Sequence, residues 1–295
     1  MTDRPPRLPR AADDREVVRP PLPEPLPVAV QDSHCHIDIC GEEDGLTVED
    51  ALAMAAGVGI DGIVQVGVDV ASSEWSVEAA ARFPRVLATV ALHPNEAPRI
   101  HADHGAAALD AAIARIDELA AHPRVRAIGE TGLDFFRTED HGREPQEYSF
   151  RRHIDIAKRT GKALVIHDRD AHDDVVRVLL DEGAPDRVVF HCFSGDDRLA
   201  RIAAENGWYC SFAGTVTFKN AKGIREGLAV LPTELVLVET DAPFLTPHPY
   251  RGQPNASYLI PYIVRHMADV RGASVESLCT ALAANTARVF GSFDE

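Results

Sequence analysis

The chain has 295 residues, a hydrophobic fraction of 45% and a formal net charge of −16 at pH 7. This length and apolar content are those of a globular protein with a substantial core, in one large domain or two small ones. The acidity means that the chain as a whole repels polyanions, so any attraction to nucleic acid must be local, from bound metal and a few arginines.

The first 27 residues differ in composition from the rest, because they are rich in proline and show little hydrophobic periodicity. This composition predicts an extended or disordered leader over residues 1–27, followed by a single domain over residues 28–295. The five cysteines include no Cys-x-x-Cys pair, which argues against a disulfide framework and favours a reducing compartment. No apolar segment is long enough to span a membrane and no signal peptide is recognisable. We therefore expect a cytoplasmic protein that does not associate with membranes.

From residue 28 onward, short β-branched runs alternate with longer segments of helical periodicity. Capping residues mark some of the helices: Thr47 begins a capping box, Pro145 opens a helix that ends near Gly161, and Ser274 precedes the last helix. Eight runs are predicted as strands: Val28–Ile37, Gly62–Val68, Val86–His93, Val125–Asp134, Ala163–His167, Arg187–Cys192, Trp208–Phe212 and Leu235–Asp241.

Eight strands that alternate with helices predict an α/β fold in which a parallel sheet closes into a (β/α)8 TIM barrel. The length fits, since such barrels typically take roughly 250 residues. A doubly wound open sheet is the alternative. The strand count favours the barrel, and no glycine-rich phosphate loop follows the first predicted strand.

The end of the first predicted strand carries two histidines, His34 and His36, two residues apart. In a strand this spacing directs both imidazoles to one face, where they can hold a transition metal. Alternation directs Cys35 to the opposite face, and we expect both Cys35 and Cys192 to be packing residues.

Later predicted strands also end in polar side chains of the kinds that bind metals. In a barrel, all these ends converge on one mouth, where enzymes of this fold place their chemistry. Six of the residues exceed what one zinc-type site needs, so two metal ions bridged by a carboxylate would use them economically. Histidine and carboxylate together suit Zn, Mn, Ni or Co, whereas Mg alone prefers more oxygen. The strand-end residues are His34, His36, His93, Glu130, His167, His191 and Asp241, of which all but His93 are the candidate ligands.

These residues lie in motifs whose order and spacing resemble the TatD family of metal-dependent deoxyribonucleases, within the amidohydrolase superfamily. The resemblance extends from about Gln31 to Phe293. Two positions depart from the family pattern, because Asp168 stands where serine is usual and Asn95 where histidine is common. The motifs are Asp32–Asp38, Ala91–Pro94, Gly129–Phe135, Val165–Ala171, His191–Gly195, Glu239–Leu245, Pro249–Gly252 and Asn255.

The resemblance implies a specific assignment of ligands. One metal ion takes His34, His36 and Asp241, the other takes His167 and His191, and Glu130 bridges them. The resemblance also implies hydrolysis of DNA, as a 3′-to-5′ exonuclease assisted by Mg or Mn. The expected partner is then a single strand or a 3′ end of DNA.

Further residues near the ligands have candidate roles. Asp241 can bind metal and orient or deprotonate the attacking water. Glu239 either binds a second water, shuttles a proton, or holds a histidine in its tautomer. His93 either contacts the phosphate, protonates the leaving group or is structural. Arg169 and Arg251 are candidate phosphate clamps, with surface ion pairs as the alternative.

Four aromatic residues, Phe136, Phe193, Phe244 and Tyr250, either stack on exposed bases or serve packing.

Two other functions remain open at this stage. The same metals could hydrolyse an aminoacyl ester, such as D-aminoacyl-tRNA, or an amide. A non-catalytic binding protein that has kept the barrel is the third possibility, and it predicts eroded ligands, none of which is missing.

Overall fold

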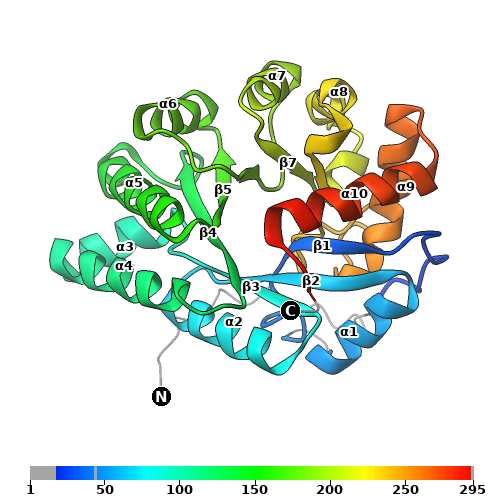
Figure 1. Cartoon of the computed structure of the whole chain (residues 1–295), viewed down its shortest axis with the longest axis horizontal. Coiled ribbons are helices and arrows are strands. Elements are labelled where there is room, and N and C mark those ends of the chain that lie inside the picture. The colour runs from blue at the N-terminus through cyan, green and yellow to red at the C-terminus, as the bar shows by residue number, and fades with distance from the viewer. Residues whose placement is uncertain (1–17, 43–44, 294–295) are drawn as a thin grey trace.

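The structure is a computed structural model that describes residues 18–42 and 45–293. Its centre is a sheet of eight parallel strands in the order β1 to β8, each hydrogen-bonded to the next (Figure 1). The prediction of a TIM barrel is confirmed, and the open-sheet alternative is wrong. The strands are β1 (Val30–Cys35), β2 (Ile60–Val66), β3 (Val86–Val90), β4 (Val125–Asp134), β5 (Ala163–Arg169), β6 (Val188–Phe190), β7 (Tyr209–Phe212) and β8 (Val236–Val238).

Helices alternate with the strands and surround the barrel (Figure 1). The predicted caps at Thr47 and Ser274 are confirmed, because each hydroxyl accepts the backbone N–H three residues later. The helix predicted to open at Pro145 begins two residues earlier, at Arg143. Pro145 therefore lies in the first turn, which tolerates proline because its N–H has no partner within the helix. The α-helices are α1 (Val48–Gly57), α2 (Val70–Arg82), α3 (Glu96–His104), α4 (Ala106–Ala120), α5 (Arg143–Thr160), α6 (His172–Glu182), α7 (Asp197–Glu205), α8 (Lys222–Val230), α9 (Ile260–Arg271) and α10 (Val275–Phe290). The short 3-10 helices are η1 (Asp140–Gly142), η2 (Gly214–Thr217), η3 (Thr233–Leu235) and η4 (Ser257–Leu259).

The interior of the barrel has an apolar layer at one end and a polar layer at the other. Val165, Val189 and Leu237 pack together in the apolar layer, which Phe290 at the end of α10 also joins. Because side chains alternate along a strand, the next inward positions of these three strands are His167, His191 and Glu239. The period of two therefore places the polar side chains one layer above an apolar floor.

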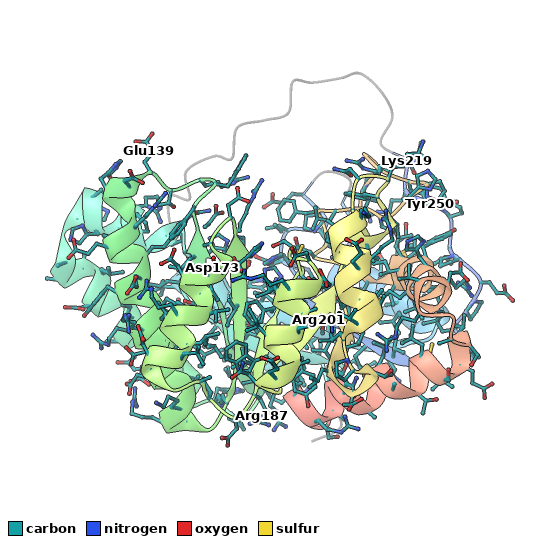
Figure 2. All side chains as sticks on the ribbon, turned by 90° about the horizontal axis from the view of Figure 1, so that it is seen from above. Glu139, Asp173, Arg187, Arg201, Lys219 and Tyr250 are labelled. Carbon is teal, nitrogen blue, oxygen red and sulfur yellow. The ribbon has the colours of Figure 1, made fainter. Side chains whose placement is uncertain are left out.

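All loops that follow strands lie at the polar end. Figure 2 shows Glu139, Lys219 and Tyr250, which follow β4, β7 and β8, on the upper side, and Arg187, which precedes β6, on the lower side. The mouth of the barrel is thus formed by the segments that follow the strands, as the fold class requires.

The barrel closes between β8 and β1, at the residues that end these strands. The backbone N–H of Asp241 donates to His34 O at 3.0 Å, and that of His36 donates to Ala242 O at 2.8 Å. The buried Asp32 carboxylate accepts the hydroxyl of Thr240 at 2.6 Å and its N–H at 3.0 Å. Closure of the sheet therefore fixes three candidate metal ligands relative to one another.

Replacing Asp32 by alanine is expected to destabilise the barrel by about 3 kcal/mol, because it leaves the buried donors of Thr240 without an acceptor. Asp32→Asn keeps one acceptor oxygen, and we expect it to cost less than half as much. Urea unfolding of both variants measures the difference. Equal losses for the two variants would contradict this expectation. Since asparagine fills the same volume as aspartate, they would show that a single acceptor oxygen recovers none of the stability.

The described part of the N-terminal segment packs on the barrel without forming a helix or strand. Tyr258 donates its hydroxyl to Pro20 O at 2.7 Å, and Leu26 N–H donates to Val58 O at 3.0 Å. Residues 1–17 of the proposed leader lie outside the described residues, so the boundary at residue 27 stays a prediction. Within the described residues, no helix has the length and apolar character of a membrane span. The cytoplasmic location also stays a prediction.

Candidate metal centre

Glu130 lies at the centre of the polar layer because of an irregularity in β4. Between Ile128 and Thr131, β4 contains one residue more than the facing stretch of β5. Such a bulge turns side chains to the other face of a strand, and here it directs Glu130 inward. Gly132 follows on the same face, where an added Cβ would lie 2.1 Å from His167 O, so only glycine allows the two strands to approach.

The two carboxylate oxygens of Glu130 face different groups of histidines. Oε1 lies 3.6 Å from His36 Nε2 and 3.8 Å from His34 Nε2. Oε2 lies 2.8 Å from His191 Nε2 and 3.2 Å from His167 Nδ1. The side chain thus stands between two clusters of nitrogen donors.

Asp241 completes the first cluster, with Oδ1 3.4 Å from His36 Nε2 and 3.7 Å from His34 Nε2. His93 lies beside the second cluster, with Nε2 3.8 Å from Glu130 Oε2. Nitrogen and oxygen atoms of His93, Glu130 and His167 lie close enough together to hold a metal ion, as do those of His34, His36 and Glu130. The structure therefore brings all six predicted ligands together, and it adds His93 to the second group.

Three of the histidines are held by hydrogen bonds from the ring nitrogen that points away from Glu130. The partners are Val66 O for His36 Nδ1 at 3.2 Å, Asp134 Oδ2 for His167 Nε2 at 3.2 Å, and Glu239 Oε1 for His191 Nδ1 at 3.3 Å. Such partners fix the ring and leave the other nitrogen free to bind metal.

The role of Asp134 was not assigned from the sequence. A signal was present, since Asp134 lies four residues after Glu130 on the same strand and therefore on the same face.

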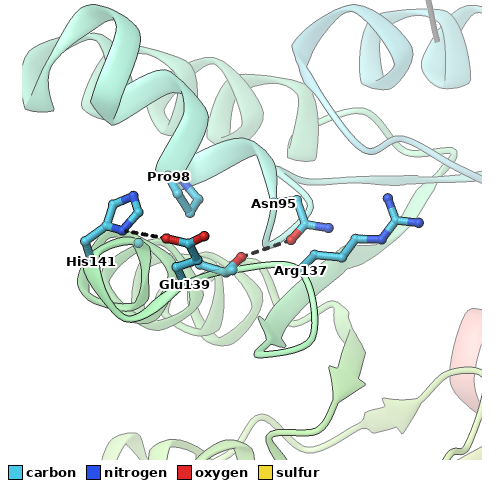
Figure 3. A pocket seen from close by; sticks show the side chains of 7 residues that line it. Asn95, Pro98, Arg137, Glu139 and His141 are labelled. Atoms are coloured by element: carbon cyan, nitrogen blue, oxygen red, sulfur yellow. Dashed lines mark hydrogen bonds and ion pairs between the residues drawn. The ribbon is translucent and has the colours of Figure 1, made fainter. Parts of the chain in front are cut away.

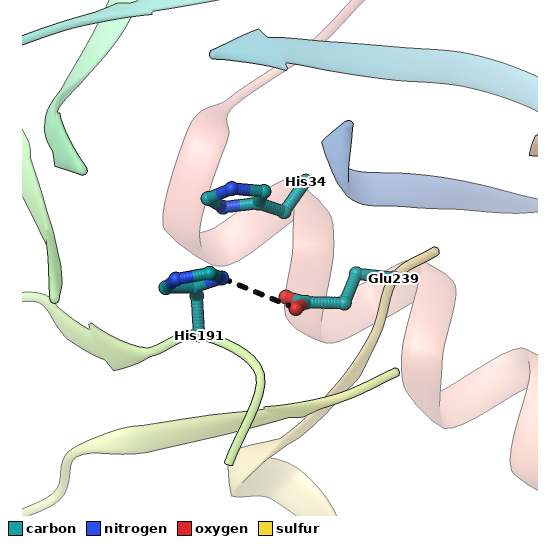
Figure 4. A group of neighbouring side chains, drawn as sticks. All are labelled: His34, His191 and Glu239. Atoms are coloured by element: carbon teal, nitrogen blue, oxygen red, sulfur yellow. Dashed lines mark hydrogen bonds and ion pairs between the residues drawn. The ribbon is translucent and has the colours of Figure 1, made fainter. Parts of the chain in front are cut away.

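His34 is the clearest sign that this site accommodates a cation. The side chain is completely buried, and neither ring nitrogen has a hydrogen-bond partner. Its ring stacks on His191, with centroids 3.8 Å apart, above Glu239 (Figure 4). Buried polar atoms are rarely left unpaired. The donor set of neutral imidazoles and carboxylates fits divalent transition metals.

The charges of the site are balanced between carboxylate and imidazoles. Burial alone would raise the pKa of Glu130, but His191 and His93 hold it well below its usual range. The pKa of His191 is well above its usual range in spite of burial, because Glu130 and Glu239 face it. Burial lowers the pKa of His93 to about 3, so its imidazole is neutral at pH 7 in the metal-free protein.

The two candidate phosphate clamps lie over aromatic rings at the mouth. The Arg169 guanidinium is 3.8 Å from the centroid of Phe136, and that of Arg251 is 4.0 Å from Phe218. Within the described chain neither guanidinium pairs with a carboxylate. Asp168, next to Arg169 in the sequence, binds His172 at 2.7 Å.

The structure decides between the two alternatives for Phe193 and contradicts the expectation for Cys192. Phe193 is buried and packs on Phe212, so it is not available to stack on a base. Cys192 is partly exposed, because its backbone turns into the left-handed region at φ 43° instead of continuing the strand. Cys35 is buried, as expected.

Phe136 and Phe244 are exposed, by 62% and 43%, whereas Tyr250 packs edge-on against Tyr262, with ring centroids 5.3 Å apart.

The chain matches a known protein family over most of its length. Residues 31–291 match the family model described as TatD related DNase. The chain belongs to the TatD family. TatD relatives include an uncharacterized metal-dependent hydrolase from Mycobacterium tuberculosis, 45% identical over 88% of this chain and 97% of that protein. The metal-dependent hydrolase YabD from Bacillus subtilis is 34% identical over 88% of this chain and 98% of its own length.

Solved structures agree with this assignment. The TatD homologue YjjV from Escherichia coli superimposes with a TM-score of 0.79 at 26% identity, over 89% of this chain and 98% of that one. The protein is thus a metal-dependent hydrolase of the TatD family, and its metal ligands are to be sought among the clustered histidines and carboxylates.

Proposed function

We propose that the protein is a two-metal deoxyribonuclease that removes nucleotides from the 3′ end of DNA. The observation that carries the two-metal part is the position of Glu130, whose two oxygens face separate histidine clusters. Carboxylate-bridged pairs of ions serve in-line displacement at phosphorus. His34, His36 and Asp241 would hold one ion, and His167 and His191 the other, with Mn, Zn, Mg, Ni or Co as candidates. The 3′-to-5′ polarity rests on the family resemblance.

The reaction adds the oxygen of a water molecule to phosphorus, breaks the bond from phosphorus to the 3′ oxygen, and returns a proton to that oxygen. Divalent ions in such a site lower the pKa of water and neutralise charge on phosphoryl oxygens. Asp241 would take the proton from water, because its carboxylate lies beside the first cluster and is partly exposed.

Glu239 and His93 have other roles in this proposal. Glu239 is completely buried and binds both His191 and the N–H of Cys192, so it orients His191 and does not shuttle protons. His93 Nε2 lies 3.8 Å from Glu130 Oε2, a position that suits contact with metal or phosphate.

The mouth offers local attraction for a polyanion in spite of the acidic chain. Among the described residues no carboxylate pairs with the guanidinium groups of Arg169 and Arg251, and each group lies over an aromatic ring. Guanidinium groups bind phosphates in bidentate geometry, and exposed aromatics such as Phe136 stack on unpaired bases. A single strand or a frayed 3′ end reaches such a recessed site more easily than an intact duplex.

The test compares two substrates in parallel with Mn²⁺ or Mg²⁺. One is a single-stranded oligonucleotide labelled at its 5′ end, and the other is D-aminoacyl-tRNA. We expect the labelled strand to shorten stepwise, and this activity to disappear with a chelator. Release of the amino acid without shortening of DNA would favour the ester hydrolase, and no nucleotide release with any metal would refute the nuclease.

A further inference from the structure

A pocket beside the metal centre has no role in the function described so far. It has a volume of about 400 Å³ and lies between the start of α3 and the segment that joins β4 to α5. Its lining includes Asn95, Pro98, Arg137, Glu139 and His141 (Figure 3). We propose that this pocket binds one nucleotide of the substrate. This inference rests on the proposed nuclease function.

Hydrogen bonds connect the pocket to a metal ligand. Asn95 Nδ2 donates to Asp134 Oδ2 at 3.3 Å, and the same oxygen lies 3.2 Å from Nε2 of His167. The N–H of Asn95 also contacts Nδ1 of His93 at 3.1 Å. Only one side chain therefore separates the wall of the pocket from the second histidine cluster.

The wall at this end is rigid. Asn95 Oδ1 accepts the hydroxyl of Thr138 at 3.1 Å, and that hydroxyl accepts an N–H from Gln146 at 2.8 Å. Gln146 in turn accepts the N–H of Asp134 at 3.1 Å. A closed network of this kind holds a binding surface in place before the ligand arrives, which lowers the entropy cost of binding.

The pocket has a direction. Figure 3 shows Asn95 and Arg137 at one end, Pro98 and His141 at the other, and Glu139 between them. The end with Asn95 is the one joined to the metal centre, so the phosphate of a bound nucleotide belongs there and the base at the far end.

Arg137 suits the phosphate end. Its backbone N–H is fixed by Asp134 Oδ1 at 2.9 Å, while its exposed guanidinium has no carboxylate partner within residues 18–42 and 45–293. The backbone of Arg137 is thus fixed next to the metal centre, and its guanidinium can bind a phosphate in bidentate geometry.

The far end suits a nucleobase. The Pro98 ring provides an apolar surface, and the Glu139 carboxylate, 3.6 Å from His141 Nδ1, provides acceptors for the N–H groups of a base. The volume of about 400 Å³ lies in the lower part of the range for small-molecule sites and has room for one nucleotide.

The test measures binding of nucleotides to the full-length protein loaded with Mn²⁺, by isothermal titration calorimetry. The probes are dGMP and inorganic phosphate. We expect dGMP to bind about tenfold more tightly than phosphate, since only dGMP reaches the far end. Arg137→Gln should weaken binding of both probes about tenfold, whereas Glu139→Ala should weaken only dGMP.

Arg201→Gln, on the exposed side of α7, is the control for the loss of one positive charge. Equal affinities of dGMP and phosphate in the wild type, or no greater effect of Arg137→Gln than of Arg201→Gln, would overturn the proposal. Thermal melting verifies that each variant is folded.

Hydrolysis of bis(4-nitrophenyl) phosphate separates this proposal from the proposed function, because that compound contains no nucleoside. If the wild type hydrolyses no phosphodiester, the nuclease proposal fails. The calorimetry then still tests whether the pocket binds a nucleotide. If the wild type shortens DNA but the pocket variants bind dGMP as the wild type does, the pocket inference alone is wrong.

Discussion

Glu130→Gln is expected to lower the hydrolysis of phosphodiesters about 10³-fold, which corresponds to about 4 kcal/mol of transition-state stabilisation. The substitution keeps the size of the side chain but replaces one oxygen with an amide group that cannot bind a metal. Since Oε1 faces His36 and Oε2 faces His191, one of the two clusters must lose the oxygen that Glu130 provides. We therefore also expect the purified variant to retain one ion where the wild type holds two.

Hydrolysis of bis(4-nitrophenyl) phosphate and elemental analysis after dialysis measure both effects. Glu49→Gln is the matched control, because Glu49 is an exposed residue that pairs with Arg82 on the outer surface. A Glu130→Gln protein that keeps two ions and nearly full activity would show that Glu130 does not bridge the metals.

The strands could be predicted from the sequence because apolar β-branched runs recur with a helix between each pair. β4 was predicted with its observed limits, Val125–Asp134. β6 and β8 are shorter than predicted, since they end at Phe190 and Val238. Beyond them, Cys192 and Asp241 adopt left-handed backbone conformations, at φ 43° and 52°, which no strand continues. Apolar patterning does not register these changes in backbone conformation at the ends of the strands.

The candidate site could be predicted where the chemistry lies in the identity of a residue and its place at a strand end. His34 and His36 were predicted from alternation, although β1 ends at Cys35 and has an irregular register between Asp32 and Cys35. The inward direction of Glu130 depends on the extra residue in β4, which has no signature in the sequence. The contacts of Arg169 could not be predicted from the sequence either, because the flanking Asp168 and Asp170 indicate an ion pair. Asp168 binds His172 instead, and Arg169 lies over Phe136, because the choice of partner depends on packing between loops.

Removal of metal is expected to abolish hydrolysis and to lower the melting temperature by about 10 °C. An ion that binds only the folded state stabilises it by about 2.7 kcal/mol when its concentration is 100 times its dissociation constant. Two such ions contribute about 5 kcal/mol, and each kcal/mol shifts the melting temperature of a domain of this size by roughly 2 °C. The metal-free protein also leaves both nitrogens of the buried His34 without a partner.

Scanning calorimetry before and after treatment with EDTA measures this shift, and addition of Mn²⁺ or Zn²⁺ should restore both stability and activity. EDTA that is already saturated with Mn²⁺ is the control for effects of the chelator itself. The Glu130→Gln variant connects the two experiments, because a protein that holds one ion should lose only about half as much stability on chelation. If wild type that elemental analysis shows to be metal-free melts at the original temperature and still hydrolyses phosphodiesters, then the clustered histidines are not a metal centre. The unpaired ring nitrogens of His34 would then need another explanation.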